Sequence, residues 1–175
     1  MNEKRRLATV WLDGCSGCHM SILDMDERLL QLLSTEYELV YSPLVDVKVF
    51  PKDVDITLVE GAVSNDDDLH KIKMVRENTR TLVSLGDCAV TANVPSLRNS
   101  FTVNELLERV SAGQLPRQPD EVPLLCAHAL PVHRYVTVDV FVPGCPPSAD
   151  TIHFVLSELA AGRRPDVSAL TRFGA

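Results

Sequence analysis

Apolar residues follow two different spacings along the chain, and together these spacings predict alternating strands and helices. Compact apolar runs rich in β-branched residues predict strands at residues 7–12, 38–45, 53–62, 79–86 and 136–144. Apolar residues at the three- and four-residue spacing of one helix face predict helices over 22–33, 64–78, 103–112 and 149–161. This order favours an α/β fold of the flavodoxin-like, doubly wound kind, with a mostly parallel sheet and helices on both faces.

Short polar side chains mark the expected helix starts. Ser64 precedes a run of acidic residues and is expected to be an N-cap, since negative charge is favoured in the first helical turn. Thr102 and Glu105 have the spacing of a capping box, and Ser148 is expected to cap the last helix. The proline-rich stretch 114–123 is expected to be a surface loop, because too little chain follows it to form a second core.

Composition and charge exclude several classes of protein. The 17 Lys and Arg residues against 24 Asp and Glu give a net charge of −7 without any basic tract, so nucleic acid is not an expected partner. No apolar run approaches the roughly 18 residues that a membrane span needs. The twin arginines at the start precede only a short apolar stretch, so we expect a cytoplasmic protein forming one domain over residues 1–175. An odd number of cysteines, five, points to metal or redox chemistry in such a protein.

Four of the cysteines follow predicted strands. Cys15 and Cys18 come after the first strand, Cys88 after the fourth and Cys145 after the last. Because the carboxyl ends of parallel strands meet at the same edge of a sheet, we expect these thiols to converge. A glycine, which lets backbone approach a bulky group, stands shortly before the cysteine in each loop: Gly14, Gly86 and Gly144.

A four-thiolate [4Fe–4S] cluster accounts for the number of thiols, their loops and the glycines together. A thioredoxin-like dithiol would use Cys15 and Cys18 but leave Cys88 and Cys145 unexplained. A structural zinc site usually needs a second closely spaced pair. A flavin-binding electron carrier would use the same sheet edge, yet its first loop would need a phosphate cradle rather than thiols. Cys126, outside these loops, is interpreted as a free buried cysteine.

Four motifs in order resemble the small subunit of [NiFe] hydrogenases, especially the cytoplasmic, NAD-reducing, bidirectional kind. They are CSGCHMSILD (15–24), DITLVEGA (55–62), GDCA (86–89) and PGCPP (143–147). The resemblance extends from Leu12 to about Leu159 and implies that the four thiols hold the proximal [4Fe–4S] cluster. By the same resemblance, Pro146 stiffens the last ligand loop.

The resemblance also implies a function and partners. Dihydrogen would be split at the nickel–iron centre of a separate large subunit, and electrons would pass through this chain to a diaphorase module that carries FMN, further iron–sulfur clusters and NAD. The chain ends soon after its last predicted helix, so we expect one cluster and no additional C-terminal cluster domain. The related respiratory complex I-type iron–sulfur subunit has adjacent cysteines where this chain has C-x-x-C, which favours a hydrogenase. Gly14 stands where many hydrogenases have an acidic residue.

A few other side chains are candidates for roles near the thiols. Glu60 ends the third predicted strand, and is either a solvated loop carboxylate or a proton relay or redox-linked iron ligand. His128 and His133 are given no role. Residues near the first cysteine loop are assigned either to a partner interface or to the core: Trp11, His19, Met20 and Met25.

Overall fold

A five-stranded parallel sheet forms the centre of the protein in the computed structural model, which describes residues 4–111 and 122–174. The strand order is β2-β1-β3-β5-β7, and every neighbouring pair is parallel. This is the flavodoxin order, so the predicted fold class is confirmed. The strands are β1 (Arg5–Trp11), β2 (Tyr37–Tyr41), β3 (Val54–Glu60), β5 (Thr79–Leu85) and β7 (Val140–Val142).

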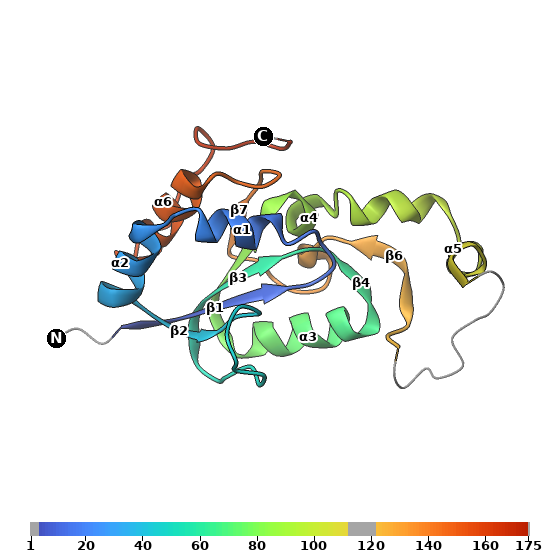
Figure 1. Ribbon diagram of the computed structural model, residues 1–175, viewed down its shortest axis with the longest axis horizontal. Helices are drawn as coiled ribbons and strands as arrows, with labels where there is room; N and C mark the ends of the chain where they lie inside the picture. Colours follow the sequence, from blue (N-terminus) through green and yellow to red (C-terminus); the bar gives the residue numbers. More distant parts are fainter. Residues whose placement is uncertain (1–3, 112–121, 175) are drawn as a thin grey trace.

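Helices cover both faces of this sheet (Figure 1). α1 (Gly17–Leu23), α2 (Glu27–Thr35) and α6 (Ala149–Ala160) lie on one face, and α3 (Asp66–Glu77) lies on the other. Side chains alternate between the two faces along each strand, as the pleat requires. Leu58 therefore packs under α1, α2 and α6, whereas its neighbour Val59 packs against α3.

The prediction of one continuous helix over residues 22–33 is wrong. α1 ends at Leu23 and α2 begins at Glu27, with Asp26 between them at φ 51°, outside the helical range. The apolar spacing survives the break because the turn still directs its side chains inward, and Met25 is buried. Periodicity alone therefore could not reveal the break.

Two predicted strands are shorter than expected. β2 ends at Tyr41, before the Ser42–Pro43 step, where proline cannot donate to a ladder. The predicted strand 136–144 is paired only from Val140, because the carboxylate of Asp139 takes the place of a ladder partner. Its Oδ2 accepts hydrogen bonds from the backbone N–H of Leu82 at 2.7 Å and from Arg76 at 2.7 Å.

A second, two-stranded antiparallel sheet was not predicted. It pairs β4 (Val63–Asn65) with β6 (Leu125–Leu130), next to the 3₁₀ helix η1 (Pro95–Ser100) and α5 (Val103–Ser111). Cys126 lies on β6 and is half-buried, so its interpretation as a buried cysteine is corrected. Arg98 donates to the carbonyl oxygens of Ser64 and Cys126 and so holds the small sheet to η1.

Most of the expected helix starts are found. Glu105 and Thr102 form the capping box, and Ser148 accepts a hydrogen bond from the Thr151 N–H. The N-cap of α3 is Asn65 rather than Ser64, since Asn65 accepts from the N–H of Asp68 at 2.8 Å. The end of the helix expected at 112 and most of the loop expected at 114–123 lie outside the described residues.

The remaining short elements are α4 (Gly86–Thr91), which follows β5, and the 3₁₀ helix η2 (Val132–Arg134). Across residues 4–111 and 122–174, no helix combines the length and the apolar character that crossing a membrane would take.

Candidate metal centre

The structure brings the four predicted thiols to one edge of the sheet. Cys15 lies in the turn after β1, with Cys18 in the first turn of α1. Cys88 lies in α4 immediately after β5, and Cys145 follows β7. All three strands end at this edge, since they run parallel (Figure 1). All four cysteines are free thiols.

The thiols are close enough to affect one another's ionisation. Burial raises the pKa of the Cys18 thiol far above its ordinary value, and the negative charges of Glu60 and of the other three thiols raise it further. Burial also raises the pKa of Cys88, although a hydrogen bond from the Val94 N–H opposes the shift. Four thiolates here would repel one another, so ionisation requires a compensating positive charge such as that of bound iron.

The four thiols differ in exposure. Cys18 and Cys88 are buried, whereas Cys15 and Cys145 are exposed. The Nδ2 atom of Asn93 donates to the Cys145 sulfur at 3.6 Å. A group bound by all four sulfurs would thus have an inner side within the protein and an outer side at the surface.

Glycine is required at two of the cysteine loops. Gly86 has φ +82°, and a Cβ added there would lie 2.2 Å from the Cys18 sulfur. Gly144 has φ +133°, and its added Cβ would lie 2.7 Å from the backbone of Pro147. At Gly14 an added Cβ would lie 3.2 Å from the Cα of Gly61, so this glycine allows the two backbones to pack closely. A Cβ added at Gly17 would also approach a thiol, at 3.3 Å from the Cys15 sulfur, but the approach at Gly86 is much closer.

Replacing Gly86 with alanine should remove bound iron and destabilise the metal-free chain by about 1–3 kcal/mol. The added methyl group displaces the Cys18 sulfur and strains a left-handed backbone position. Iron content and urea unfolding of the metal-free chain measure the two effects. Gly162→Ala is the matched control, because Gly162 has φ +72° but its added Cβ has no neighbour closer than 3.9 Å. Equal losses in both variants would show that backbone strain alone is responsible.

The loop of Cys145 is fixed by contacts to two other elements. Pro146 follows Cys145 through a cis peptide bond, and the carbonyl oxygen of Pro147 accepts a hydrogen bond from Ser21 of α1 at 2.5 Å. Thr171 donates to the carbonyl oxygen of Pro143 at 2.7 Å. The first contact holds the last cysteine loop against α1, and the second holds it against the segment that follows α6.

Asp87 is a functional residue that sequence reasoning missed. Its Oδ1 accepts from the Gly144 N–H at 2.7 Å, and its own N–H donates to the Gly144 carbonyl oxygen at 2.8 Å. Its Oδ2 accepts from the Gly174 N–H at 2.7 Å. Asp87 is buried and joins the loop of Cys88 to that of Cys145. Its position in the sequence, between Gly86 and Cys88, was the signal that could have identified it as part of the site.

Glu60 is buried, so its interpretation as a solvated loop carboxylate is wrong. Its carboxylate accepts from the N–H groups of Cys18 at 3.3 Å and His19 at 2.9 Å, and Oε2 lies 2.5 Å from Nδ1 of His19. These donors occupy the start of α1, where the helix dipole also favours negative charge. Glu60 thereby holds the backbone that carries Cys18.

The four side chains proposed for an interface or the core divide evenly. His19 and Met25 are buried, at 2% and 1% exposure, and belong to the interior. Trp11 and Met20 are 44% and 45% exposed and remain available to a partner. Trp11 lies beside the first cysteine loop, since its indole N–H donates to the Gly14 carbonyl oxygen at 3.3 Å.

The donor set fits an iron–sulfur cluster. Thiolates are soft ligands that select such clusters, zinc or Cu(I). Within the described ranges, no three His, Cys, Asp or Glu side chains are grouped so as to hold a single metal ion. The Cys18 sulfur occupies the position where a Cβ of residue 86 would lie, so Gly86 leaves room for one of the proposed ligands. Four free thiols carried by three loops therefore have the donor chemistry that an iron–sulfur cluster requires.

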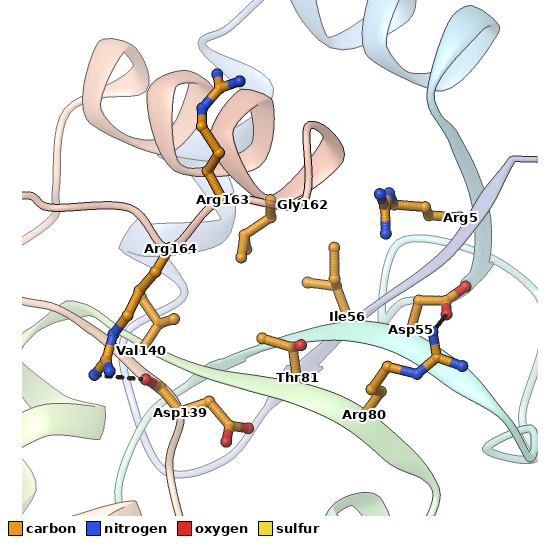
Figure 2. A pocket seen from close by; sticks show the side chains of 11 residues that line it. Arg5, Asp55, Ile56, Arg80, Thr81, Asp139, Val140, Gly162, Arg163 and Arg164 are labelled. Carbon is orange, nitrogen blue, oxygen red and sulfur yellow. Dashed lines mark hydrogen bonds and ion pairs between the residues drawn. The ribbon is translucent and has the colours of Figure 1, made fainter.

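A cleft of about 340 Å³ lies at the opposite, amino-terminal edge of the sheet (Figure 2). Two of its arginines have partners in the lining: Arg80 pairs with Asp55 at 3.3 Å, and Arg164 donates to the backbone carbonyl oxygen of Asp139. Arg5 uses its Nε to hold the carbonyl oxygen of Ala160 at the end of α6. Neither the thiols nor Glu60 line this cleft, so it does not extend the candidate site.

Comparisons with known proteins agree with the motifs. The family model described as NADH ubiquinone oxidoreductase, 20 Kd subunit, matches residues 15–159. The delta subunit of the NAD-reducing hydrogenase HoxS of Cupriavidus necator is 39% identical over 97% of this chain and 86% of that protein. The F420-non-reducing hydrogenase vhu of Methanococcus voltae has a subunit that is 37% identical over 95% of this chain. The chain spans 60% of that relative's length.

Solved structures give the same result. A chain of the NAD+-reducing [NiFe]-hydrogenase in the H2-reduced state matches with a TM-score of 0.90 and 38% identity, over 98% of this chain and 99% of that one. The [NiFeSe] hydrogenase of Desulfovibrio vulgaris Hildenborough matches with a TM-score of 0.62 at 17% identity, over 89% of this chain and 59% of that one, and shows a shared fold. The chain therefore belongs to the NADH ubiquinone oxidoreductase 20 Kd subunit family, and its predicted resemblance to the small subunit of an NAD-reducing [NiFe] hydrogenase is confirmed.

Proposed function

We propose that this chain is the electron-transfer subunit of a [NiFe] hydrogenase, with one proximal [4Fe–4S] cluster bound by Cys15, Cys18, Cys88 and Cys145. The observation that carries the proposal is the meeting of four free thiols from three separate loops at one sheet edge. When bound, the cluster supplies reversible one-electron oxidation and reduction. The chain contributes the ligands and their surroundings.

Residues near the thiols would set the cluster's potential. Hydrogen bonds to sulfur and burial are the main means by which a protein tunes such a group. The Val94 N–H stabilises the ionised form of Cys88, and Asn93 donates to the sulfur of Cys145. Both donors belong to the chain that follows α4, so this segment supplies hydrogen bonds to one buried and one exposed sulfur.

Glu60 supports the first cysteine loop in this proposal. Its two oxygens already accept from Cys18 and His19, which makes it a positioning residue for the start of α1. A proton relay or a shift onto iron would require Glu60 to give up part of this hydrogen bonding. The geometry therefore favours the positioning role over the two alternatives.

The proposed partners are a large subunit that carries the nickel–iron centre and a diaphorase module that carries FMN, further iron–sulfur clusters and NAD. Exposed apolar side chains near the thiols, Trp11 and Met20, support burial of this edge by another subunit. The identity to a subunit of an NAD-reducing hydrogenase supports the choice of partners.

A dithiol oxidoreductase is less well supported. That class needs only Cys15 and Cys18, and it gives no reason for Cys88 and Cys145 to follow neighbouring strands to the same sheet edge. A complex I-type subunit shares the family model, but the relatives described above are hydrogenase subunits. Both alternatives also lack an explanation for the C-x-x-C spacing together with Cys88 and Cys145.

Anaerobic purification tests the proposal directly. The protein should contain about four irons and four acid-labile sulfides per chain and give a paramagnetic spectrum on reduction. One zinc per chain with no sulfide, or no metal in protein produced with an intact cluster-assembly system, would refute it.

A further inference from the structure

The chain that follows α6 returns to the edge of the sheet that carries the thiols. Residues 165–174 are called the C-terminal segment below. Its first part lies beside β7, because residues 164–168 line one groove together with two residues of that strand. The buried side chain of Val167 anchors the segment to the core. The carbonyl oxygen of Val167 then accepts from the Thr171 N–H at 3.2 Å, and this turn directs the rest of the segment toward the cysteine loops.

Two hydrogen bonds tie the C-terminal segment to the cysteine loops. The Thr171 hydroxyl donates to the carbonyl oxygen of Pro143 at 2.7 Å, in the loop of Cys145. The Gly174 N–H donates to Oδ2 of Asp87 at 2.7 Å, in the loop of Cys88. The segment therefore contacts the loops of two thiols that follow different strands.

Asp87 joins the two loops and the C-terminal segment at one buried carboxylate. Its side chain is 4% exposed, and each of its oxygens accepts one backbone N–H: Oδ1 from Gly144 and Oδ2 from Gly174. Hydrogen bonds to an ionised group are roughly twice as strong as those between neutral groups. An amide of the same shape could accept at only one of the two positions, because its other end carries donors.

The loop of Cys145 depends on such support because its thiol is exposed. The side chains of Cys18 and Cys88 are buried and are held by the packing around them, whereas the position of Cys145 depends more on its backbone. Gly144 directly precedes it, and Asp87 bonds both the N–H and the carbonyl oxygen of Gly144. An exposed ligand is also the one at which a solute can compete for bound iron.

We propose that Asp87 is a positioning residue for Cys145, and that the C-terminal segment, by holding the same loop, slows the release of bound iron. The segment thereby becomes part of the metal centre although it supplies no ligand. The effect on iron rests on the cluster proposed above. The hydrogen bonds that hold the loop belong to the chain itself and are testable without iron.

Thr171→Val tests the C-terminal segment without altering the buried carboxylate. The change keeps the shape of the side chain and removes the hydroxyl that donates to the loop of Cys145. Removal of iron from the full chain by a ferrous chelator, measured anaerobically, should become about three- to tenfold faster, the effect of losing one hydrogen bond. Thr171→Ser keeps the hydroxyl and should restore the original rate. Asp166→Asn is the matched control, because Asp166 lies on the same segment and accepts from Ser168 within it.

Asp87→Asn tests the positioning residue itself. Removal of iron should become about tenfold faster or more, because a buried N–H loses its acceptor. The paramagnetic spectrum of the reduced protein should also change, since the geometry at Cys145 changes. A loss of overall stability alone would leave the spectrum of the folded protein as it was. Should Asp87→Asn fail to fold, Thr171→Val should still show the changed spectrum and Thr171→Ser the original one.

Hydrogen exchange in the metal-free chain separates this inference from the proposed function. The Gly144 N–H, which Asp87 protects, should exchange about three- to tenfold faster in Thr171→Val than in Asp166→Asn. If no variant contains iron, the proposed function fails and this exchange rate alone decides whether the segment holds the loop. Equal exchange rates, iron removal no faster than in Asp166→Asn, or equal behaviour of Thr171→Ser and Thr171→Val would each overturn the inference.

Discussion

Replacing both Cys88 and Cys145 by serine should lower the iron content from about four atoms per chain to nearly none. These thiols come from the fourth and fifth strands of the parallel sheet and supply half of the proposed ligands. Cys88 is also buried, and burial disfavours ionisation of the serine hydroxyl that replaces it. A neutral hydroxyl is a poor ligand for iron in such a cluster. Iron and sulfide analysis after anaerobic purification, with the paramagnetic spectrum of the reduced protein, provides the measurement.

Cys126→Ser is the matched control for this prediction. Cys126 is a half-buried cysteine on β6, away from the three thiol-bearing loops, so its loss should leave the iron content unchanged. Retention of full iron content by the double variant would contradict the four-thiol site. Retention of thiol–disulfide exchange by that variant, without iron in either protein, would instead favour a dithiol enzyme.

Glu60→Ala should destabilise the metal-free chain by about 3 kcal/mol or more, since each buried hydrogen-bond donor left without its acceptor costs about 1–3 kcal/mol. The change leaves the Cys18 and His19 N–H groups and the His19 ring without their acceptor, in a region closed to solvent. Urea unfolding of the metal-free chain measures the loss. Glu77→Ala, an exposed position at the end of α3, should stay within about 0.5 kcal/mol of the unchanged protein.

Glu60→Gln distinguishes the proposed roles of this carboxylate. The amide keeps an acceptor for one N–H but cannot serve all three donors, so a smaller loss of stability is expected. If Glu60 positions the first cysteine loop, Glu60→Gln should shift the cluster potential, and turnover should fall because electron transfer through the cluster depends on that potential. An unaltered redox titration together with unaltered turnover would exclude any functional role for Glu60 beyond stability.

The sequence predicted the central sheet because its signal is local. Strands such as β3 are short apolar runs buried on both faces, and the residues that follow them necessarily gather at one edge. The pairing of β4 with β6 joins residues 60 to 67 positions apart, Asn65 with Leu125 and Val63 with Leu130, and neither short strand has a strong pattern of its own. Only tertiary contacts reveal such a pair.

Contacts between residues far apart in the sequence were also missed at the candidate site. Cysteines and glycines are recognisable by type, whereas the roles of Asp87 and His19 depend on partners elsewhere in the chain. Asp87 serves a loop 57 positions away, and His19 meets an acceptor 41 positions away. A histidine next to a cysteine motif gave no indication that its ring would be buried against a carboxylate. The burial of Glu60 was hidden for the same reason.

The unequal exposure of the thiols has a consequence for assembly. With Cys15 and Cys145 open to water, a cluster in the isolated chain would be insulated on one side only. Solvent access is one of the factors that set an iron–sulfur potential, so docking of a neighbouring subunit would change that potential as it excludes the water. Quaternary association would then be the step that completes the surroundings of the electron carrier and fixes its working potential.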